Sequence, residues 1–187
     1  CEGLGRNNSK TLALLDRGEE EHFWGVQIFG SETDCLKRAV EKVLPFKPTL
    51  LDLNCGCPVP KVTNTGAGAA LMKDPEQIQE FVETLVRAVE ESGTMVPVAA
   101  KIRSGWDDRN INFLEAGKAI EAAGASLVTL HPRTRSQVYS GKSNWKQIES
   151  LSRSLSIPVV GSGDLFSPEQ AVKMLEETGC AGIMFAR

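Results

Sequence analysis

One pattern recurs six times along the chain: a short apolar run is followed by a longer segment whose apolar residues are spaced as on one face of a helix. The apolar runs, each predicted as a strand, are 23–29, 49–54, 96–102, 126–130, 157–160 and 181–185. Nearly continuous apolar runs are typical of parallel strands covered on both faces. Because the units repeat without a topological break, the pattern favours an α/β fold of the (β/α)8 (TIM) barrel type over a doubly wound sheet.

Helix starts and stops support the same fold. Two segments, Asp74-Pro75-Glu76-Gln77 and Ser167-Pro168-Glu169-Gln170, place a capping side chain directly before a proline, as is common at a helix N-terminus. Ser31 and Asn112 are predicted to begin two further helices, and Gly124 is predicted to end one.

Six units are too few to close a barrel of eight strands. The chain also begins at Cys1 rather than at Met, and it stops at Arg187 directly after a predicted strand. We therefore expect a fragment of a longer protein, in which residues 1–187 form most of one barrel domain and the first two strands precede Cys1. No linker or low-complexity segment divides these residues.

Composition narrows the class of protein. The 187 residues are 41% hydrophobic and 24% charged, which is ordinary for one soluble domain. A net charge of −3 argues against a broad basic face for nucleic acid, although not against a local one. No apolar run is long enough to cross a bilayer, and five scattered Cys do not resemble a disulfide framework. We therefore expect a cytoplasmic protein without membrane contact.

Polar and small residues gather where the predicted strands end, which is where (β/α)8 barrels build their sites. They are Gln27, Asn54, Cys57, Lys101, Arg103, His131, Arg133, Arg135, Ser162, Gly163, Asp164, Ala186 and Arg187. Lys101 follows three apolar residues, and an ammonium group buried there needs an anionic or strongly polar partner.

A phosphate site is predicted at the last two strands. Gly161-Ser162-Gly163 is a turn of small residues after a buried strand, and backbone N–H groups of such a turn can hold a phosphate. Barrels commonly place this site after their seventh and eighth strands, so the missing two strands would come first. A phosphate anchor together with Gln27 and Lys101 fits FMN better than a simple sugar phosphate.

Several segments together carry a specific resemblance. They are Asp52–Pro58, Lys61-Val62, Gly66–Leu71, Gln27–Gly30, Lys101–Trp106, His131–Arg135 and Gly163-Asp164. On these segments, from about Gly3 to Arg187, the chain resembles the dihydrouridine synthase family of flavin enzymes, which reduce uridine in tRNA. The Asn-x-Gly-Cys-Pro and His-x-Arg-Thr elements are the most specific of them.

The resemblance implies a function and its cofactors. The enzyme would reduce the C5–C6 double bond of tRNA uridines, with a hydride from reduced FMN reaching C6, a proton from Cys57 reaching C5, and NADPH as the reductant. Gln27, Lys101 and His131 would lie beside the flavin; Ser162, Gly163, Asp164, Ala186 and Arg187 would hold its phosphate; Asn54, Arg133 and Arg135 would place the substrate. The resemblance also implies a monomer with a C-terminal helical tRNA-binding domain, which residues 1–187 do not include.

The residue types agree with that chemistry. Hydride addition to C6 leaves negative charge at C5 and O4, so an acid is needed on the opposite ring face. A thiol with the ordinary pKa of about 8.5 is largely protonated at neutral pH and can give up its proton.

The sequence departs from the family pattern in three places. Ser162 stands where the family usually has Asn, which removes a side-chain contact, and Ala186 stands where Gly is usual. The first-strand Pro-Met-Ala-Gly run is absent.

Two other functions stay open at this point. One is an FMN barrel acting on a small molecule, as dihydroorotate dehydrogenases do, although the arginines of 131–135 favour RNA. The other is a non-catalytic RNA-binding relative, against which the retention of Cys57 and Lys101 argues. A metal site at Cys55 and Cys57 is not expected, because the sequence has no Cys-x-x-Cys pair to supply the other ligands.

Overall fold

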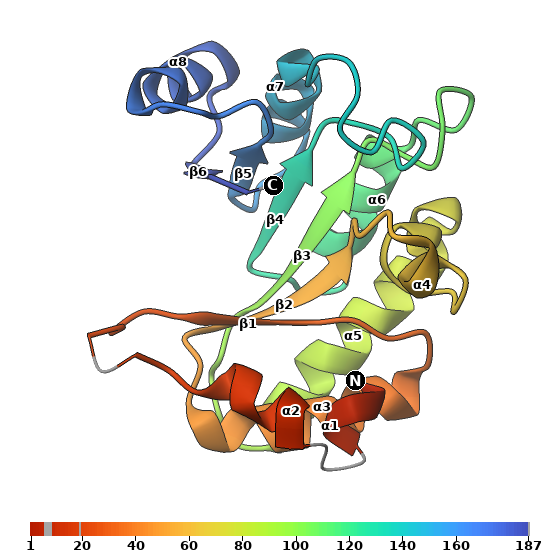
Figure 1. The fold of residues 1–187 in the computed structure, drawn as a ribbon, viewed down its shortest axis with the longest axis vertical. Helices are drawn as coiled ribbons and strands as arrows, with labels where there is room; N and C mark the ends of the chain where they lie inside the picture. The colour runs from red at the N-terminus through yellow and green to blue at the C-terminus, as the bar shows by residue number, and fades with distance from the viewer. Residues whose placement is uncertain (6–8, 19, 187) are drawn as a thin grey trace.

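The computed structural model describes residues 1–5, 9–18 and 20–186, and its centre is one six-stranded sheet. All five strand pairs are parallel, and the strands lie side by side in sequence order (Figure 1). The strands are β1 (Gly25–Ile28), β2 (Leu50–Cys55), β3 (Val98–Arg103), β4 (Leu127–His131), β5 (Val159–Ser162) and β6 (Gly182–Met184). Sequential parallel order is that of a (β/α) barrel, here incomplete, as the sequence predicts.

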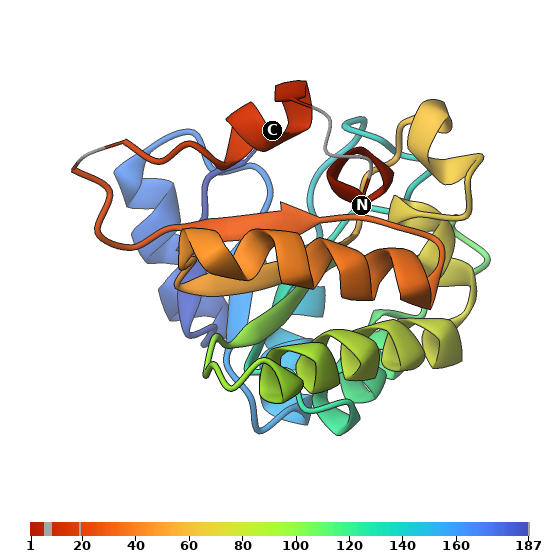
Figure 2. The same ribbon diagram turned by 90° about the horizontal axis from the view of Figure 1, so that it is seen from below.

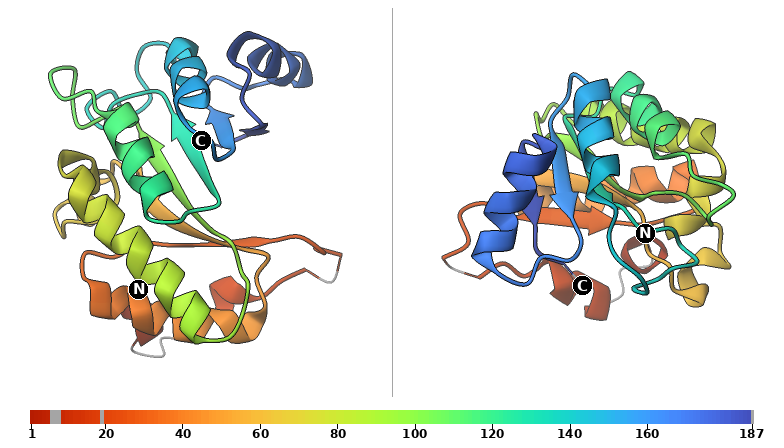
Figure 3. Two further views of the ribbon diagram at one scale, coloured as in Figure 1. Left: turned by 180° about the vertical axis from the view of Figure 1, so that it is seen from behind. Right: turned by 90° about the horizontal axis from the view of Figure 1, so that it is seen from above.

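The longer helices follow the strands and cover one face of the sheet, as the view from behind shows (Figure 3). They are α3 (Thr33–Val43), α5 (Pro75–Glu91), α6 (Phe113–Ala122), α7 (Trp145–Ser154) and α8 (Pro168–Thr178). Each of these helices contacts the next one in the chain. Shorter elements complete the chain: α1 (Glu2–Gly5), α2 (Ser9–Leu12), η1 (Ala13–Leu15), η2 (Leu44–Phe46), α4 (Pro60–Thr63) and η3 (Gly68–Lys73).

Two predicted N-caps are confirmed by their hydrogen bonds. An Asp74 carboxylate oxygen accepts from the backbone N–H groups of Glu76 and Gln77 at the start of α5. The Ser167 hydroxyl accepts from the N–H of Gln170 at the start of α8. Both caps satisfy N–H groups that have no partner inside the helix.

Two other predicted starts differ in detail. The prediction of a cap at Ser31 is wrong, because α3 begins at Thr33 after Glu32 and has no side-chain cap. Asn112 does occupy the cap position of α6, but its side-chain amide donates 2.8 Å to the carbonyl of Met72 instead. That bond ties the start of α6 to η3.

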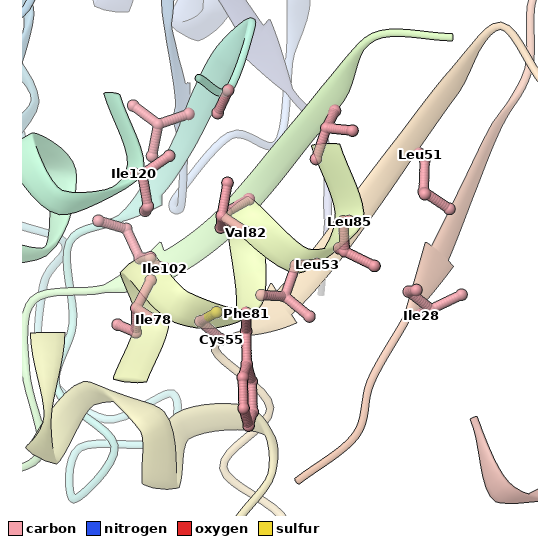
Figure 4. Packing of buried hydrophobic residues seen from close by; sticks show 14 of the residues in the cluster. Ile28, Leu51, Leu53, Cys55, Ile78, Phe81, Val82, Leu85, Ile102 and Ile120 are labelled. Carbon is pink, nitrogen blue, oxygen red and sulfur yellow. The ribbon is translucent and has the colours of Figure 1, made fainter. Parts of the chain in front are cut away.

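The main core lies between the sheet and its helices. Side chains alternate between the two faces of a strand, and β2 directs Leu51, Leu53 and Cys55 to the helical side, where all three are fully buried. Ile78 and Leu85 of α5, also fully buried, belong to the same apolar cluster (Figure 4). Burial of such side chains contributes roughly 1.5–3 kcal/mol each.

The opposite face of the central strands is polar, and the prediction of strands apolar on both faces is wrong there. Alternation places Asp52 and Asn54 on the face away from the helices. The register pairs Gln27 with Asp52 and Asn54 with Lys101, so these side chains share one face. Polar groups on an inner face need partners or a ligand, which makes this face the candidate site.

The N-terminal segment lies along the free edge of β1 (Figure 2). The Cys1 ammonium group donates 2.8 Å to the carbonyl of Phe29, just past the end of β1. The strand is shorter than the predicted 23–29, and Phe23 is 89% exposed. Within the described ranges, no helix has the length and apolar character needed to cross a membrane.

Candidate functional site

A cavity of about 290 Å³ opens at the carboxyl ends of the strands. It collects residues from β1, the loop after β2, β3, β4 and the end of β6. Its lining residues are Gln27, Asn54, Gly56, Cys57, Pro58, Val59, Lys101, Arg103, His131, Tyr139, Met184 and Ala186. Five residues predicted for the site from sequence (the amides of 27 and 54, the thiol of 57, the ammonium of 101 and the imidazole of 131) therefore meet in one cavity.

The loop that carries Cys57 is held on both sides. The side-chain oxygen of Asn54 accepts from the N–H of Gly56 (3.1 Å) and of Cys57 (2.8 Å). The carbonyl of Cys57 accepts from the N–H of Ala69 at 3.0 Å. Gly68 has a φ of +61°, and a Cβ there would lie 2.9 Å from that carbonyl, so only glycine fits beneath the thiol. The half-buried Cys57 is consequently fixed at the cavity wall.

Behind Asn54 lies a residue that the sequence analysis did not select. Asp52 is 8% exposed and accepts a 2.6 Å hydrogen bond from the Gln27 amide. Burial raises the pKa of Asp52 to about 6, while the Gln27 bond and the Lys101 charge act in the opposite direction. A sequence signal existed: Asp52 interrupts an apolar strand at a position two residues before Asn54, hence on the same face.

Two cations of β3 line the same cavity. Burial, and then the charge of Arg103, lower the pKa of Lys101, whereas Asp52 raises it. Arg103 is only 3% exposed and donates to the carbonyls of Gly56 (2.7 Å), Thr134 and Val138 (2.9 Å each). Its guanidinium therefore joins the Cys57 loop to the loop after β4.

His131 and Arg133 form a second buried group beside the cavity. Arg133 donates 2.7 Å to the Asp164 carboxylate and contacts the His131 Nε2 at 3.2 Å. Burial, followed by the charges of Arg103, Lys101 and Arg133, lowers the pKa of His131 to about 3. The imidazole is therefore neutral, and its Nε2 can accept from Arg133.

This neutral imidazole predicts a pH effect on stability. The folded pKa of about 3 lies below the ordinary 6.5, so the stability that His131 contributes is present above pH 6.5 and is lost as pH falls toward 3. The loss is at most about 1.4 kcal/mol per pH unit. Asp52 opposes it, because a folded pKa of about 6 above the ordinary 3.8 stabilises the fold as pH falls through that window.

Urea unfolding between pH 7 and pH 4.5 measures the effect in wild type and His131→Asn. We expect the variant to lose the part of the pH slope that His131 supplies. The exposed His22, the other histidine of the chain, lines neither cavity, so His22→Asn is the control variant against which the slope of His131→Asn is compared. Equal slopes for wild type and His131→Asn would contradict the prediction.

A second cavity of about 750 Å³ adjoins the first, since His131, Tyr139 and Ala186 line both. Its floor includes the predicted phosphate turn at Gly163 and Asp164. The hydroxyls of Ser162 and Ser143 are buried next to this turn without a hydrogen-bond partner. The Asp164 carboxylate is already occupied: it accepts from Arg133 and, at 2.7 Å, from the N–H of Ser143. Burial raises the pKa of Asp164, but these two donors outweigh it and leave that pKa low.

Gly163 cannot be replaced without disturbing this turn. Its φ is +103°, and a Cβ would clash with the Ser143 hydroxyl and lie 2.7 Å from the His131 ring. We expect Gly163→Ala to lower the free energy of unfolding by roughly 2–4 kcal/mol, from backbone strain plus overpacking. Gly93→Ala is the matched control, because Gly93 has a φ of +73° with nothing within 4 Å, and should lose only the strain of roughly 1–2 kcal/mol. Equal urea midpoints for the two variants would show that the clash is absent.

Three predicted residues remain: Arg135, Ala186 and Arg187. Arg135 stacks on Trp106, 4.6 Å from the ring centroid, and Lys73 lies 3.8 Å from the same ring. Arg135 lines neither cavity, whereas Ala186 lines both. Tyr139, 57% exposed, also lines both cavities and was not among the predicted site residues. Arg187 lies outside the described residues.

Among residues 1–5, 9–18 and 20–186, no group of three or more His, Cys, Asp or Glu side chains could hold a metal ion. Cys55, the nearest thiol in sequence to Cys57, faces the helices and is fully buried. Burial and the neighbouring Asp52 raise its pKa well above the ordinary range, so it is an uncharged core residue.

Curated proteins of similar sequence are named as tRNA-dihydrouridine synthases. A probable tRNA-dihydrouridine synthase of Treponema pallidum (strain Nichols) is 41% identical over 191 residues, covering 100% of this chain and 56% of the relative. The tRNA-dihydrouridine synthase B of Pseudomonas aeruginosa is 36% identical over 184 residues, covering 98% and 54%. The chain thus spans about half the length of the curated relatives it matches.

A solved structure shares the fold at low identity. The crystal structure of 2,3-dimethylmalate lyase, a PEP mutase/isocitrate lyase superfamily member, superposes with a TM-score of 0.59 at 15% identity, covering 86% of this chain and 52% of that one. The profile described as "Dihydrouridine synthase (Dus)" matches residues 4–187. Because that match spans nearly the whole of the sequence, the chain belongs to the dihydrouridine synthase family.

Proposed function

We propose that this chain is the catalytic barrel segment of a tRNA-dihydrouridine synthase that reduces the C5–C6 double bond of uridine. The observation that carries the proposal is the convergence of Cys57, Gln27, Asn54, Lys101 and His131 on one cavity at the strand ends. The names of the curated relatives supply tRNA as the substrate.

The residues present fit FMN. The smaller cavity offers amide and ammonium groups to a carbonyl-rich ring, and the adjoining cavity ends at a glycine turn with two unpartnered buried hydroxyls. Buried hydroxyls without partners are costly, and phosphate oxygens can satisfy them. We propose that Gln27, Lys101 and His131 lie beside the ring. For the phosphate we propose the Ser162 hydroxyl and the backbone around Gly163, with Asp164 and Ala186 contributing through the backbone. Arg187, predicted for the same site, lies outside the described residues.

Bound FMN supplies the hydride, with NADPH as the proposed electron donor. Cys57 supplies the proton: its S–H bond breaks as a C–H bond forms at C5 of the uracil, and the resulting thiolate is reprotonated from solvent. Lys101 places a positive charge in the same cavity. That charge stabilises the negative charge that develops on the uracil O4.

The contacts of the three predicted substrate residues support different roles for Asn54, Arg133 and Arg135. Both ends of the Asn54 amide are engaged by protein partners, which supports a role in holding the Cys57 loop. Arg133 is likewise occupied by Asp164 and by the carbonyls of Ser140 and Gly141. For Arg135, which stacks on Trp106 and lines neither cavity, we propose a contact with a phosphate of the RNA backbone.

The test uses the enzyme that contains this chain, purified with its bound cofactor. We expect a flavin absorbance spectrum, bleaching by NADPH, and tRNA whose mass rises by two hydrogen atoms at a uridine. Flavin that bleaches with no change in tRNA, but with turnover of a small cyclic substrate such as dihydroorotate, would replace this proposal with the small-molecule barrel. Tight tRNA binding without flavin or turnover would replace it with a non-catalytic RNA-binding protein.

Four wider features are part of the same proposal. Residues 1–187 would be a partial FMN-binding barrel, and a C-terminal helical domain would bind the tRNA. The enzyme would act in the cytoplasm as a monomer. Size-exclusion chromatography with light scattering tests the monomer, because a dimer elutes with twice the mass.

A further inference from the structure

Asp52 is a buried carboxylate for which the proposed chemistry has no use. It lies on the polar face of β2, 8% exposed, in register with Gln27 of β1 and Ala99 of β3. Desolvation makes a buried carboxylate costly, and an apolar residue of similar size would stabilise a sheet interior better. The raised pKa of about 6 reflects that cost. A carboxylate at this position is costly, so its role is sought in the groups that Asp52 contacts.

Asp52 touches a chain of two amides that ends at the Cys57 loop. Its Oδ2 accepts from Gln27 Nε2 at 2.6 Å, and Gln27 Oε1 accepts from Asn54 Nδ2 at 2.6 Å. Asn54 Oδ1 then accepts from the N–H groups of Gly56 and Cys57. Each amide therefore uses its nitrogen toward Asp52 and its oxygen toward Cys57.

The direction of this chain is fixed from both ends. An ionised carboxylate can only accept, so Gln27 must present its NH2 group to Asp52 and its oxygen to Asn54. A backbone N–H can only donate, so Asn54 must present its oxygen to Cys57. The two requirements agree, and a flip of either amide would place a donor against a donor. Ionisation at neutral pH is consistent with a pKa of about 6 and with the nearby charge of Lys101.

We propose that Asp52 is a positioning residue: its acceptor oxygen orients the Gln27 and Asn54 amides, and through them it holds the Gly56–Cys57 turn in place. Its importance for turnover rests on the proposed function, because only there does Cys57 give up a proton. The orientation itself does not depend on flavin or tRNA, since every contact in the chain lies within the protein.

Two substitutions separate the acceptor from the charge. Asp52→Asn keeps an oxygen that Gln27 can reach, so the turn should stay in place. Asp52→Leu has a similar size but no acceptor, which leaves the Gln27 NH2 group without a partner and frees both amides to rotate. Thr129→Val is the matched control, because Thr129 is 2% exposed and pairs with Lys101 in register, yet has no bond to the chain of amides.

Alkylation of individual cysteines by iodoacetamide, followed by tandem mass spectrometry, reads out the turn in flavin-free protein. The alkylation rate of Cys57 reports the position of the turn. The rate of Cys55, which is fully buried at the end of β2, reports unfolding. We expect Asp52→Leu to change the alkylation rate of Cys57 roughly ten-fold, while Cys55 stays protected from alkylation. Asp52→Asn and Thr129→Val should change it less than about two-fold.

Three results would overturn the proposal. Cys55 and Cys57 of Asp52→Leu could become reactive together, which would show a purely structural role. The Cys57 rate could stay at the wild-type value, or Asp52→Asn could behave as Asp52→Leu does, which would assign the effect to charge. Failure of the proposed function would appear instead in the tRNA mass measurement, with the alkylation pattern unchanged.

Turnover provides a second readout in the loaded enzyme. Misplacing the thiol should lower kcat in Asp52→Leu. The KM for tRNA should stay near the wild-type value, because Asp52 contacts Gln27 and does not itself line the cavity. Asp52→Asn should retain most of the wild-type kcat. A rise in KM with kcat unchanged would contradict a role in positioning Cys57.

Discussion

Cys57→Ala is expected to lower the rate of uridine reduction by roughly 10²–10⁴-fold, the usual range for loss of a positioned general acid. The substitution removes the thiol from the cavity wall, while Asn54 still accepts from the two backbone N–H groups, so the turn should keep its shape. Flavin content should stay at the wild-type level. Single-turnover oxidation of the reduced enzyme by tRNA measures the chemical step directly.

The control for this variant is Cys35→Ala. Cys35 is a buried thiol on α3 and lines neither cavity at the strand ends, so its loss should leave the rate unchanged apart from a modest cost in stability. Cys57→Ser should keep part of the activity only if a hydroxyl can reach the same atom. A wild-type rate in Cys57→Ala would remove the thiol from the mechanism and leave the proton source to water.

The order of the sheet and most of the site could be predicted because both follow from short-range pattern. Parallel strands with helical crossovers bring their carboxyl ends to one edge, so the residues after each apolar run must meet there. This places Gln27, Asn54, Cys57, Lys101 and His131 together without knowledge of any side-chain contact. The caps at Asp74 and Ser167 were equally predictable, since each depends on only three or four residues.

The partners of these residues could not be predicted, because they depend on distant segments. Arg103 reaches carbonyls 31 to 47 residues away, and Asp52 meets Gln27 across 25 residues. The predicted cap at Ser31 was wrong because the loop after β1 continues to Glu32 before α3 starts. The polar inner face was missed although a local signal for it exists: Asp52 and Asn54 lie two positions apart in an otherwise apolar run, hence on one face of the strand.

Arg133→Met is expected to lower the free energy of unfolding by about 3 kcal/mol, the lower end of the cost of breaking a buried ion pair, because the Asp164 side chain is 28% exposed. The Arg133 side chain is 6% exposed and donates to Asp164, to the carbonyls of Ser140 and Gly141, and toward His131. Methionine fills similar volume but makes none of these bonds. Urea unfolding of flavin-free protein gives the difference.

Arg135→Met is the matched control, since the same change two residues later removes only a stacking contact with Trp106 and should cost less than about 1 kcal/mol. The double variant Arg133→Met/Asp164→Asn separates the two parts of the loss. If the orphaned Asp164 carboxylate causes most of it, neutralising that group should recover part of the stability, whereas additive losses would show that the carbonyl contacts dominate. The same carboxylate, freed beside the Gly163 turn, would repel a phosphate, so the single variant should also bind FMN more weakly than the double variant does.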